Sequence, residues 1–163
     1  QSMLDELTSL HNRRGFMVEG KKKAKECLKN NRYLLVFYGD MDDLKLINDN
    51  HGHEEGDLAL KGIAEVLKRT FREEDLIARI GGDEFIVLLS VSKTQTELDE
   101  VILERFTKIL DAHNSESNAP YTISMTMGVT SNLEDDEKGL ETLMREADER
   151  LMAKKRARKV GRG

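Results

Sequence analysis

Cysteine, proline and long apolar runs are scarce in this sequence of 163 residues. Cys27 is the only cysteine, which excludes an intrachain disulfide and a thiolate metal cluster. We expect it to pack on the first helix, in a protein located in the cytoplasm. No apolar run reaches the length of a membrane span, and the N-terminus lacks the pattern of a signal peptide. The formal net charge of −5 does not favour bulk nucleic-acid binding, so we expect contact with neither nucleic acid nor membrane.

The length suits a single domain, residues 1–163, with a hydrophobic core of its own. The order of helical and strand patterns indicates an α/β sandwich. The predicted elements are a helix Arg13–Asn30, a strand Tyr33–Tyr38, a short helix from Leu44, a helix after Asp57, strands Leu76–Ile80 and Glu84–Leu89, a helix Thr94–His113, a strand Tyr121–Thr130 and a helix Lys138–Arg158. The strand from Tyr33 is almost wholly apolar and should be buried on both faces, whereas the strand from Tyr121 alternates and should have one polar face.

The stretch Gly81-Gly82-Asp83-Glu84-Phe85 is the most informative part of the chain. It places two adjacent carboxylates on a glycine turn between two apolar strands, which predicts a tight hairpin. Glycine there tolerates positive φ and lets a ligand approach the backbone, so we interpret the turn as a metal and phosphate site. Taken alone, it would also fit an exposed hairpin tip with solvated acids.

A second group of acids follows the strand from Tyr33, in the segment Gly39-Asp40-Met41-Asp42-Asp43. Open α/β sheets usually place ligand sites at such strand ends. If this strand pairs with the hairpin, Asp40 and Asp83 converge and supply the oxygen ligands that Mg²⁺ requires. For Asp42 or Asp43 an N-cap on the following helix is the alternative, and we expect it to hold for one of the two.

Asn48 and Asp57 lie between these acidic segments and carry an amide and a carboxylate. Together they could accept hydrogen bonds from the ring N–H and exocyclic amine of guanine. Asp57 also precedes an amphipathic helix, so it could equally be an N-cap.

Motifs in a fixed order span nearly the whole chain. They are Asp5–Phe16, the segment from Asp40 through Lys45, Asn48, Asp49, Gly52, His53, Gly56 and Asp57, then Arg79–Phe85, Thr126–Gly128, and Ala147-Asp148 with Lys155. In this order they resemble the motifs of the GGDEF domain, the catalytic module of diguanylate cyclases. The resemblance implies a ferredoxin-like palm similar to nucleotide cyclases, in which helices flank a central, mainly antiparallel sheet.

The resemblance also implies an activity, the condensation of two GTP molecules to cyclic di-GMP with loss of two pyrophosphates. It assigns Asp40, Asp83 and the Met41 carbonyl to Mg²⁺ or Mn²⁺, with Glu84 supporting the metal site. It assigns Lys45 and Lys155 to the triphosphate, and Asn48 and Asp57 to guanine. A homodimer would complete the active site. Because the chain begins almost at the opening motif, we expect a C-terminal fragment of a larger sensor protein whose N-terminal regulatory domain is missing.

The closing motif departs from the family pattern. Met152 stands in place of the usual tyrosine, Lys154 of alanine, Arg158 of glycine and Lys159 of arginine. Because lysine cannot make the bidentate phosphate contact of arginine, the triphosphate could be held less firmly or differently. Apart from Lys155, the basic residues from Lys154 to Arg158 could also be a solvated helix end.

Arg72 and Asp75 stand immediately before the strand that leads to Gly81. At this distance from the glycine pair they match the family's inhibitory site, which implies that cyclic di-GMP binds there and slows the enzyme. Arginine suits the O6 and N7 edge of guanine. The alternative is a local ion pair.

Two functional classes follow from the sequence. The first is an active, product-inhibited diguanylate cyclase. The second is a catalytically silent GGDEF module that acts as a receptor for GTP or cyclic di-GMP. The intact acidic motifs favour the enzyme, whereas the altered closing motif leaves the receptor as an alternative.

Overall fold

The computed structural model describes residues 2–94 and 97–162. Its elements are α1 Arg13–Lys29, β1 Tyr33–Met41, α2 Leu44–His51, α3 His53–Thr70, β2 Leu76–Arg79, β3 Glu84–Val91, α4 Leu98–Glu116, β4 Met125–Ser131 and α5 Leu140–Arg162. The strands form one antiparallel sheet in the order β2-β3-β1-β4. None of the helices in these ranges is long and apolar enough to cross a membrane.

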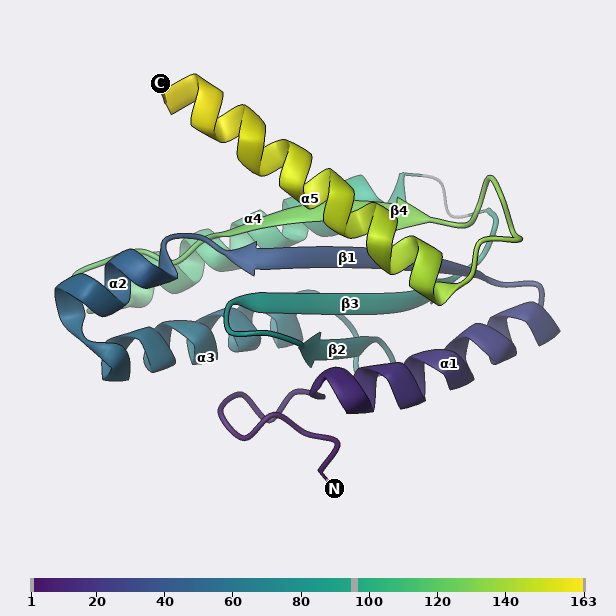
Figure 1. Cartoon of the computed structure of the whole chain (residues 1–163), viewed down its shortest axis with the longest axis horizontal. Helices are drawn as coiled ribbons and strands as arrows, with labels where there is room; N and C mark the ends of the chain where they lie inside the picture. The colour runs from purple at the N-terminus through teal and green to yellow at the C-terminus, as the bar shows by residue number, and fades with distance from the viewer. Residues whose placement is uncertain (1, 95–96, 163) are drawn as a thin grey trace.

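Helices cover both faces of the sheet (Figure 1). One layer of core joins the odd-numbered side chains of β1, such as Leu35 and Phe37, to helices α3 and α4. The other joins even-numbered side chains, such as Val36, to α1 and α5, and it includes Cys27. The predicted sandwich, the burial of β1 on both faces and the packing of Cys27 on the first helix are therefore confirmed.

The last strand differs from its prediction. It begins at Met125 rather than Tyr121, because the backbone of Ile123 is instead held by the side chain of Asn114, which donates to its carbonyl at 2.8 Å and accepts from its N–H at 2.9 Å. The predicted polar face does carry Thr126 and Thr130, but it is not open to solvent, since α5 covers it and buries both residues. The Thr130 hydroxyl donates to Glu146 of α5 at 2.9 Å, which satisfies this buried polar group.

Helix boundaries shift by a few residues. The helix predicted from Thr94 to His113 is α4, which begins at Leu98, and residues 95–96 of the predicted range lie outside the described residues. The last helix, α5, continues past its predicted end to Arg162. Its final turns project beyond the sheet on the side where β1 ends (Figure 1). From this part of α5, Lys155 pairs with Asp40 and Arg158 with Asp42.

Candidate active site

The predicted convergence of the two acidic segments is confirmed by the strand pairing. Asp40 of β1 lies directly opposite Glu84 of β3. The N–H of Met41 donates to the carbonyl of Asp83 at 2.8 Å, which ties the hairpin to the end of β1. Because Asp40 and Glu84 lie in the register that faces α1 and α5, residues of α5 can reach them.

Asp40 is a buried carboxylate with an unsatisfied oxygen. Only 9% of the residue is exposed, and its Oδ1 has no hydrogen-bond partner among the described residues. Its Oδ2 accepts from the ammonium of Lys155. Burial raises the pKa of Asp40, and the charges of Asp83 and Asp42 act in the same direction, while Lys155 opposes them. A cation at Oδ1 would relieve this cost of burial and repulsion.

The donor set around Asp40 fits Mg²⁺ by chemistry. Within residues 2–94 and 97–162, no group of three or more histidine, cysteine, aspartate or glutamate side chains is gathered as a metal cluster. The predicted set instead combines the carboxylates of Asp40 and Asp83 with the backbone carbonyl of Met41. Such a set of hard oxygen donors suits Mg²⁺, which usually keeps several waters and takes further ligands from a substrate phosphate.

Glu84 is held by a tyrosine that the sequence did not single out. The Tyr38 hydroxyl donates to Glu84 Oε2 at 2.8 Å. Burial raises the pKa of Tyr38, and the hydrogen bond to Glu84 raises it further, so the hydroxyl remains a donor. Asp148 of α5 also belongs to this acidic group, because burial and the charges of Glu84 and Asp40 raise its pKa. The sequence showed Asp148 only as part of the closing motif, without a role.

In the hairpin, Gly81 is required because a side chain there would not fit, and not because of an unusual φ. Neither Gly81 nor Gly82 has positive φ, which corrects the expectation from turn chemistry. A Cβ at Gly81 would lie 2.3 Å from Glu84 Oε1, whereas one at Gly82 would meet nothing within 4 Å. Gly81 therefore leaves room for the carboxylate of Glu84 to fold back over the turn.

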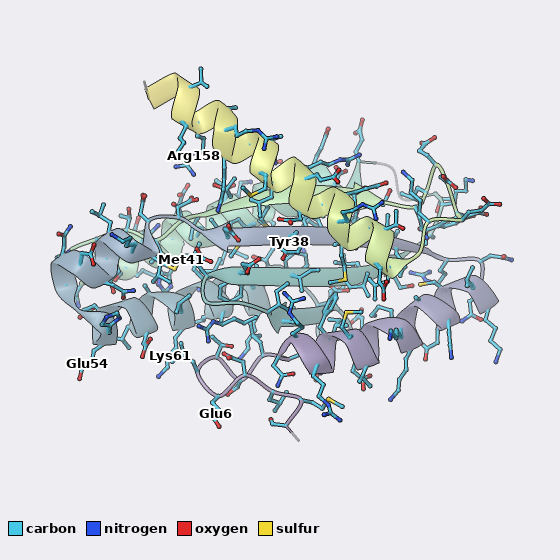
Figure 2. The ribbon with its side chains drawn as sticks, viewed as in Figure 1. Glu6, Tyr38, Met41, Glu54, Lys61 and Arg158 are labelled. Atoms are coloured by element: carbon cyan, nitrogen blue, oxygen red, sulfur yellow. The ribbon has the colours of Figure 1, made fainter. Side chains whose placement is uncertain are left out.

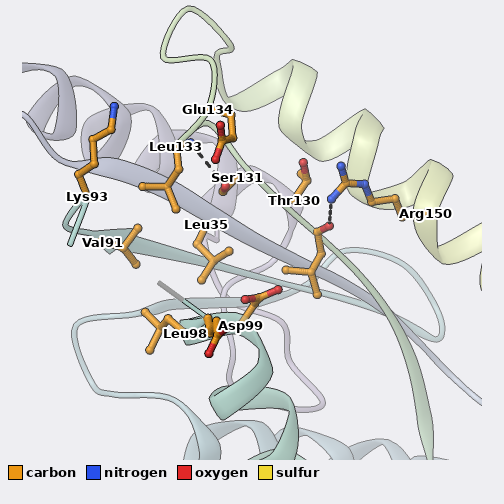
Figure 3. A pocket seen from close by; sticks show the side chains of 12 residues that line it. Leu35, Val91, Lys93, Leu98, Asp99, Thr130, Ser131, Leu133, Glu134 and Arg150 are labelled. Atoms are coloured by element: carbon orange, nitrogen blue, oxygen red, sulfur yellow. Dashed lines mark hydrogen bonds between the residues drawn. The ribbon is translucent and has the colours of Figure 1, made fainter. Parts of the chain in front are cut away.

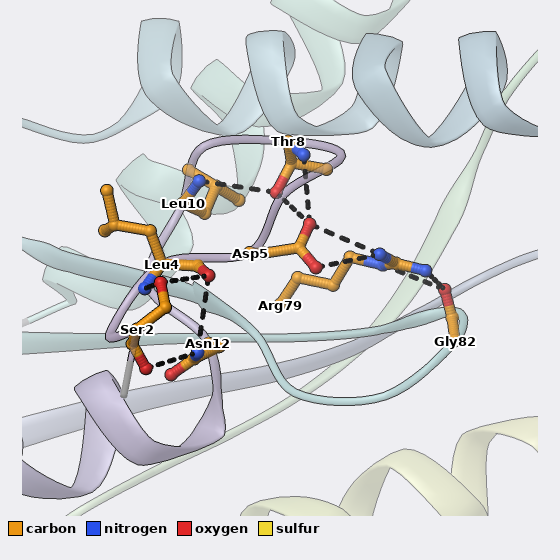
Figure 4. A network of polar contacts seen from close by, with 8 residues as sticks. All are labelled: Ser2, Leu4, Asp5, Thr8, Leu10, Asn12, Arg79 and Gly82. Atoms are coloured by element: carbon orange, nitrogen blue, oxygen red, sulfur yellow. Dashed lines mark hydrogen bonds and ion pairs between the residues drawn. The ribbon is translucent and has the colours of Figure 1, made fainter.

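Arg79 anchors the hairpin to the N-terminal segment (Figure 4). Its Nε and second terminal nitrogen donate to the Gly82 carbonyl at 3.1 and 2.9 Å. Its other terminal nitrogen donates to Asp5 Oδ1 at 3.0 Å, and Asp5 also accepts from the backbone and hydroxyl of Thr8. Burial alone would raise the pKa of Asp5, but the bonds from Thr8 and the charge of Arg79 outweigh it and lower that pKa.

Asp42 joins three separate elements. Its carboxylate accepts from the hydroxyls of Ser124 and Thr126, each at 2.7 Å, and forms an ion pair with Arg158 of α5 at 2.9 Å. The Asp42 N–H donates to the Ser124 carbonyl at 2.9 Å. Asp42 is thus a tertiary junction and not an N-cap. Asp43 does stand at the N-cap position of α2, but its side chain makes no capping hydrogen bond.

A pocket of about 290 Å³ lies between β1, α2, the hairpin and α5. Its lining residues are Met41, Asp42, Asp43, Leu44, Lys45, Asp83, Lys155, Arg158 and Lys159. Figure 2 labels two of these lining residues, Met41 and Arg158. The pocket brings Met41 and Asp83 of the predicted metal residues together with both predicted triphosphate residues, Lys45 and Lys155, whereas Asp40 and Glu84 do not line it. Its carboxylate and ammonium groups could accept a cation and an anion side by side.

The basic residues of α5 are not all solvated. Lys154 donates to the Met127 carbonyl at 2.6 Å, at the outer edge of β4, and Arg158 binds Asp42 and Thr126. These two residues are exposed but not merely solvated, because each contacts β4 and α5 continues past them to Arg162. Lys45, by contrast, is highly exposed and pairs with Asp49 at 3.3 Å.

The predicted guanine residues lie near each other. The Asn48 side chain packs over Gly56, where a Cβ would lie 1.7 Å from Asn48 Oδ1. Asp57 follows Gly56 in the chain and is exposed. It lies inside α3, which begins at His53, so its interpretation as an N-cap is wrong.

Arg72 and Asp75 line a different cavity of about 290 Å³, with Lys23, Arg32 and Arg105 also in its wall. Asp75 Oδ2 accepts from the backbone N–H of Arg72 at 2.8 Å, and burial raises the pKa of Asp75. The Arg72 guanidinium lies 4.0 Å from Glu74 and has no ion pair with Asp75 among the described residues. The local ion pair between Arg72 and Asp75 is therefore not formed, and the arginine head is exposed.

A further cavity of about 300 Å³ lies at the opposite end of the sheet (Figure 3). It is lined by the start of β1 at Leu35 and the ends of β3 and β4 at Val91 and Ser131. The carboxylates of the acidic segments do not line it. Its charged residues are separate from the candidate active site.

Comparison with known proteins shows the family. The family model "Diguanylate cyclase, GGDEF domain" matches residues 2–160, so the chain belongs to the GGDEF domain family. It is 35% identical over 158 residues to diguanylate cyclase DgcP of Pseudomonas aeruginosa, which covers 96% of this chain but 23% of DgcP. The chain therefore spans about a quarter of the length of this curated relative.

Solved structures agree with this assignment. The GGDEF domain of TpbB from Pseudomonas aeruginosa matches with a TM-score of 0.83 and 31% identity, covering 94% of this chain and 89% of that one. A microbial GGDEF domain described as interacting with cyclic di-GMP matches with a TM-score of 0.76 and 27% identity, covering 96% of this chain and 95% of that one. The expected cyclase-like fold is confirmed.

Proposed function

We propose that this domain is a diguanylate cyclase that condenses two GTP molecules into cyclic di-GMP and releases two pyrophosphates. The observation that carries the proposal is the buried Asp40 with its unsatisfied Oδ1, beside Asp83 and beneath the ammonium of Lys155. A protein that needed only to fold would gain nothing from this repulsive, half-satisfied group. The relative named diguanylate cyclase DgcP supports the same reaction class.

Asp40, Asp83 and the Met41 carbonyl would hold Mg²⁺ or Mn²⁺, and Glu84 would support that site. When bound, the metal lowers the pKa of the attacking 3′-hydroxyl and stabilises charge on the α-phosphate and its leaving group. The hydrogen bond from Tyr38 fixes the Glu84 carboxylate. The Met41 contact with Asp83 fixes the distance between the two strands that carry the ligands.

Lys155 and Lys45 would bind the triphosphate. Lys155 lies on Asp40 in this structure, and a divalent cation at Asp40 would free its ammonium for a phosphate oxygen. Lys45 lines the same pocket from the start of α2. These charges would position the α-phosphate for in-line attack, which is the main contribution of the protein.

Asn48 and Asp57 would select guanine. The Asn48 side chain packs over Gly56 where α2 meets α3, and Asp57 is the next residue of α3, with an exposed side chain. Guanine offers a ring N–H and an amine to such acceptors, and adenine presents a different pattern.

Each domain would hold one GTP, so turnover would require a homodimer with two domains face to face. We also propose that the chain is the catalytic domain of a larger cytoplasmic sensor with an N-terminal regulatory domain. Cyclic di-GMP would bind at Arg72 and Asp75 and inhibit the enzyme. The exposed guanidinium of Arg72 and the basic wall of its cavity favour an anionic guanine ligand there.

Incubation with GTP and Mg²⁺, followed by separation of the nucleotides, tests the proposal. We expect cyclic di-GMP and pyrophosphate, and neither when the metal is chelated. A catalytically silent receptor is the second candidate, because Met152, Lys154, Arg158 and Lys159 depart from the closing motif. Tight binding of GTP or cyclic di-GMP without turnover would identify that receptor.

A further inference from the structure

Arg158 belongs to the altered closing motif, lines the candidate active-site pocket and contacts Asp42 at its edge. It lines the pocket together with Asp83 and Lys155. The residue stands where the family usually has glycine, so neither the metal nor the phosphate roles considered above include it. Its placement in the structure therefore requires its own explanation.

The guanidinium is held in place by two acceptors. One terminal nitrogen donates to the Thr126 hydroxyl at 2.7 Å and lies 2.9 Å from Asp42 Oδ1. The side chain of Asp42 is only 9% exposed and that of Arg158 is 41% exposed. One nitrogen of Arg158 is thus fixed against the protein while the rest of the head remains open to solvent.

The other donors of this guanidinium are unused. Its Nε and second terminal nitrogen have no hydrogen-bond partner in the described part of the chain. Arginine presents its donors in a planar fork that matches two phosphate oxygens. A fork that is already fixed loses less side-chain entropy on binding than the flexible head of Lys159 would.

We propose that Arg158 binds a phosphate group of the nucleotide directly, and thereby supplies the bidentate contact that Lys159 cannot make. The inference deepens the proposed function and rests on a guanine nucleotide occupying this pocket. The simpler interpretation is that Arg158 only neutralises the buried Asp42. That interpretation explains one nitrogen of the guanidinium, but it gives no role to the two unpaired nitrogens of a residue that lines the pocket.

The test compares Arg158→Lys with Arg156→Lys, a matched control on the same helix whose side chain is exposed and has no partner among the described residues. Arg158→Lys keeps a positive charge for Asp42 but loses the fork. A second variant, Arg158→Gln, keeps an amide donor for Asp42 and removes the charge. Thermal melting checks that each variant is folded.

Binding is measured in the presence of Mg²⁺ with 3′-deoxy-GTP, which lacks the attacking hydroxyl and cannot condense. Guanosine, which has no phosphate, is titrated separately by NMR. We expect the affinity for 3′-deoxy-GTP to fall about tenfold in Arg158→Lys and further in Arg158→Gln, a change of about one decade in Kd that calorimetry resolves easily. Guanosine binding and the Arg156→Lys control should match the parent.

Equal affinity of the parent and both Arg158 variants for 3′-deoxy-GTP would overturn the inference and leave Arg158 as the partner of Asp42. Equal losses for 3′-deoxy-GTP and guanosine would also overturn it, because the residue would then act by positioning the loop. The parent could also bind 3′-deoxy-GTP through Arg158 but form no cyclic di-GMP from GTP. That result would refute the proposed cyclase activity and leave the Arg158–phosphate contact supported.

Discussion

Replacing Asp83 by alanine should separate catalysis from folding. The side chain lies at the hairpin tip, and the contact that ties the tip to β1 uses the Asp83 carbonyl, which the substitution keeps. The Asp83 charge also repels Asp40, so its removal relieves strain on that buried group. We expect the free energy of unfolding to change by less than about 0.5 kcal/mol, as for most substitutions away from packed features.

Turnover, unlike stability, should fall strongly in Asp83→Ala. Loss of a ligand to a metal that stabilises the transition state by several kcal/mol should slow cyclic di-GMP formation at least about a thousandfold, which corresponds to about 4 kcal/mol. The assay separates nucleotides after incubation with GTP and Mg²⁺, and urea unfolding reports stability. Asp136→Ala, an exposed carboxylate in the loop before α5, is the matched control and should leave both unchanged. A rate for Asp83→Ala near that of the parent would refute the metal assignment.

Three further predictions concern base choice, inhibition and acid stability. The parent should prefer GTP over ATP by roughly 10⁴-fold in kcat/KM, because the wrong base leaves polar groups unpaired. Asp57→Ala should lose most of this preference. Comparable rates with both nucleotides in the parent would show that Asp57 does not select the base. Calorimetry should show that Arg72→Ala binds cyclic di-GMP at least about tenfold more weakly, whereas unchanged affinity would exclude a role for Arg72. The lowered pKa of Asp5 means that its ionised form stabilises the fold above the unfolded pKa of about 3.9, and that this contribution is lost as pH falls through the lower folded value. Asp5→Asn should therefore cost about 1–2 kcal/mol in urea unfolding at pH 7 and less near pH 3, and a cost independent of pH would show that the charge of Asp5 is irrelevant.

The sequence predicted the parts of the fold that depend on local pattern. The apolar run of β1, the glycine turn and the helical periodicity after Asp57 all gave the right elements. The pairing of β1 with the hairpin was only a condition in that reasoning, and the antiparallel sheet was implied by the family resemblance; the structure shows this pairing, with Asp40 opposite Glu84. The site could be located because its acids stand at strand ends, where position along the chain fixes position in space.

Contacts between distant segments could not be read in this way. The alternation of β4 did not reveal that α5 covers its polar positions, because burial of Thr126 and Thr130 depends on how the helix packs. The bond from Tyr38 to Glu84 and the junction at Asp42 likewise join residues far apart in the chain. Local capping preference suggested an N-cap for one of Asp42 and Asp43. Asp43 takes the N-cap position, whereas Asp42 is held by hydrogen bonds from Ser124 and Thr126 and by its ion pair with Arg158.

The most direct test of the central claim is the initial rate of cyclic di-GMP formation from saturating GTP and Mg²⁺ at increasing concentrations of this chain. A shared active site predicts that the rate per chain rises with concentration until the dimer is saturated, with two GTP consumed for each cyclic dinucleotide and two pyrophosphates released. Absence of cyclic di-GMP at every concentration, from folded protein that binds GTP, would contradict the account.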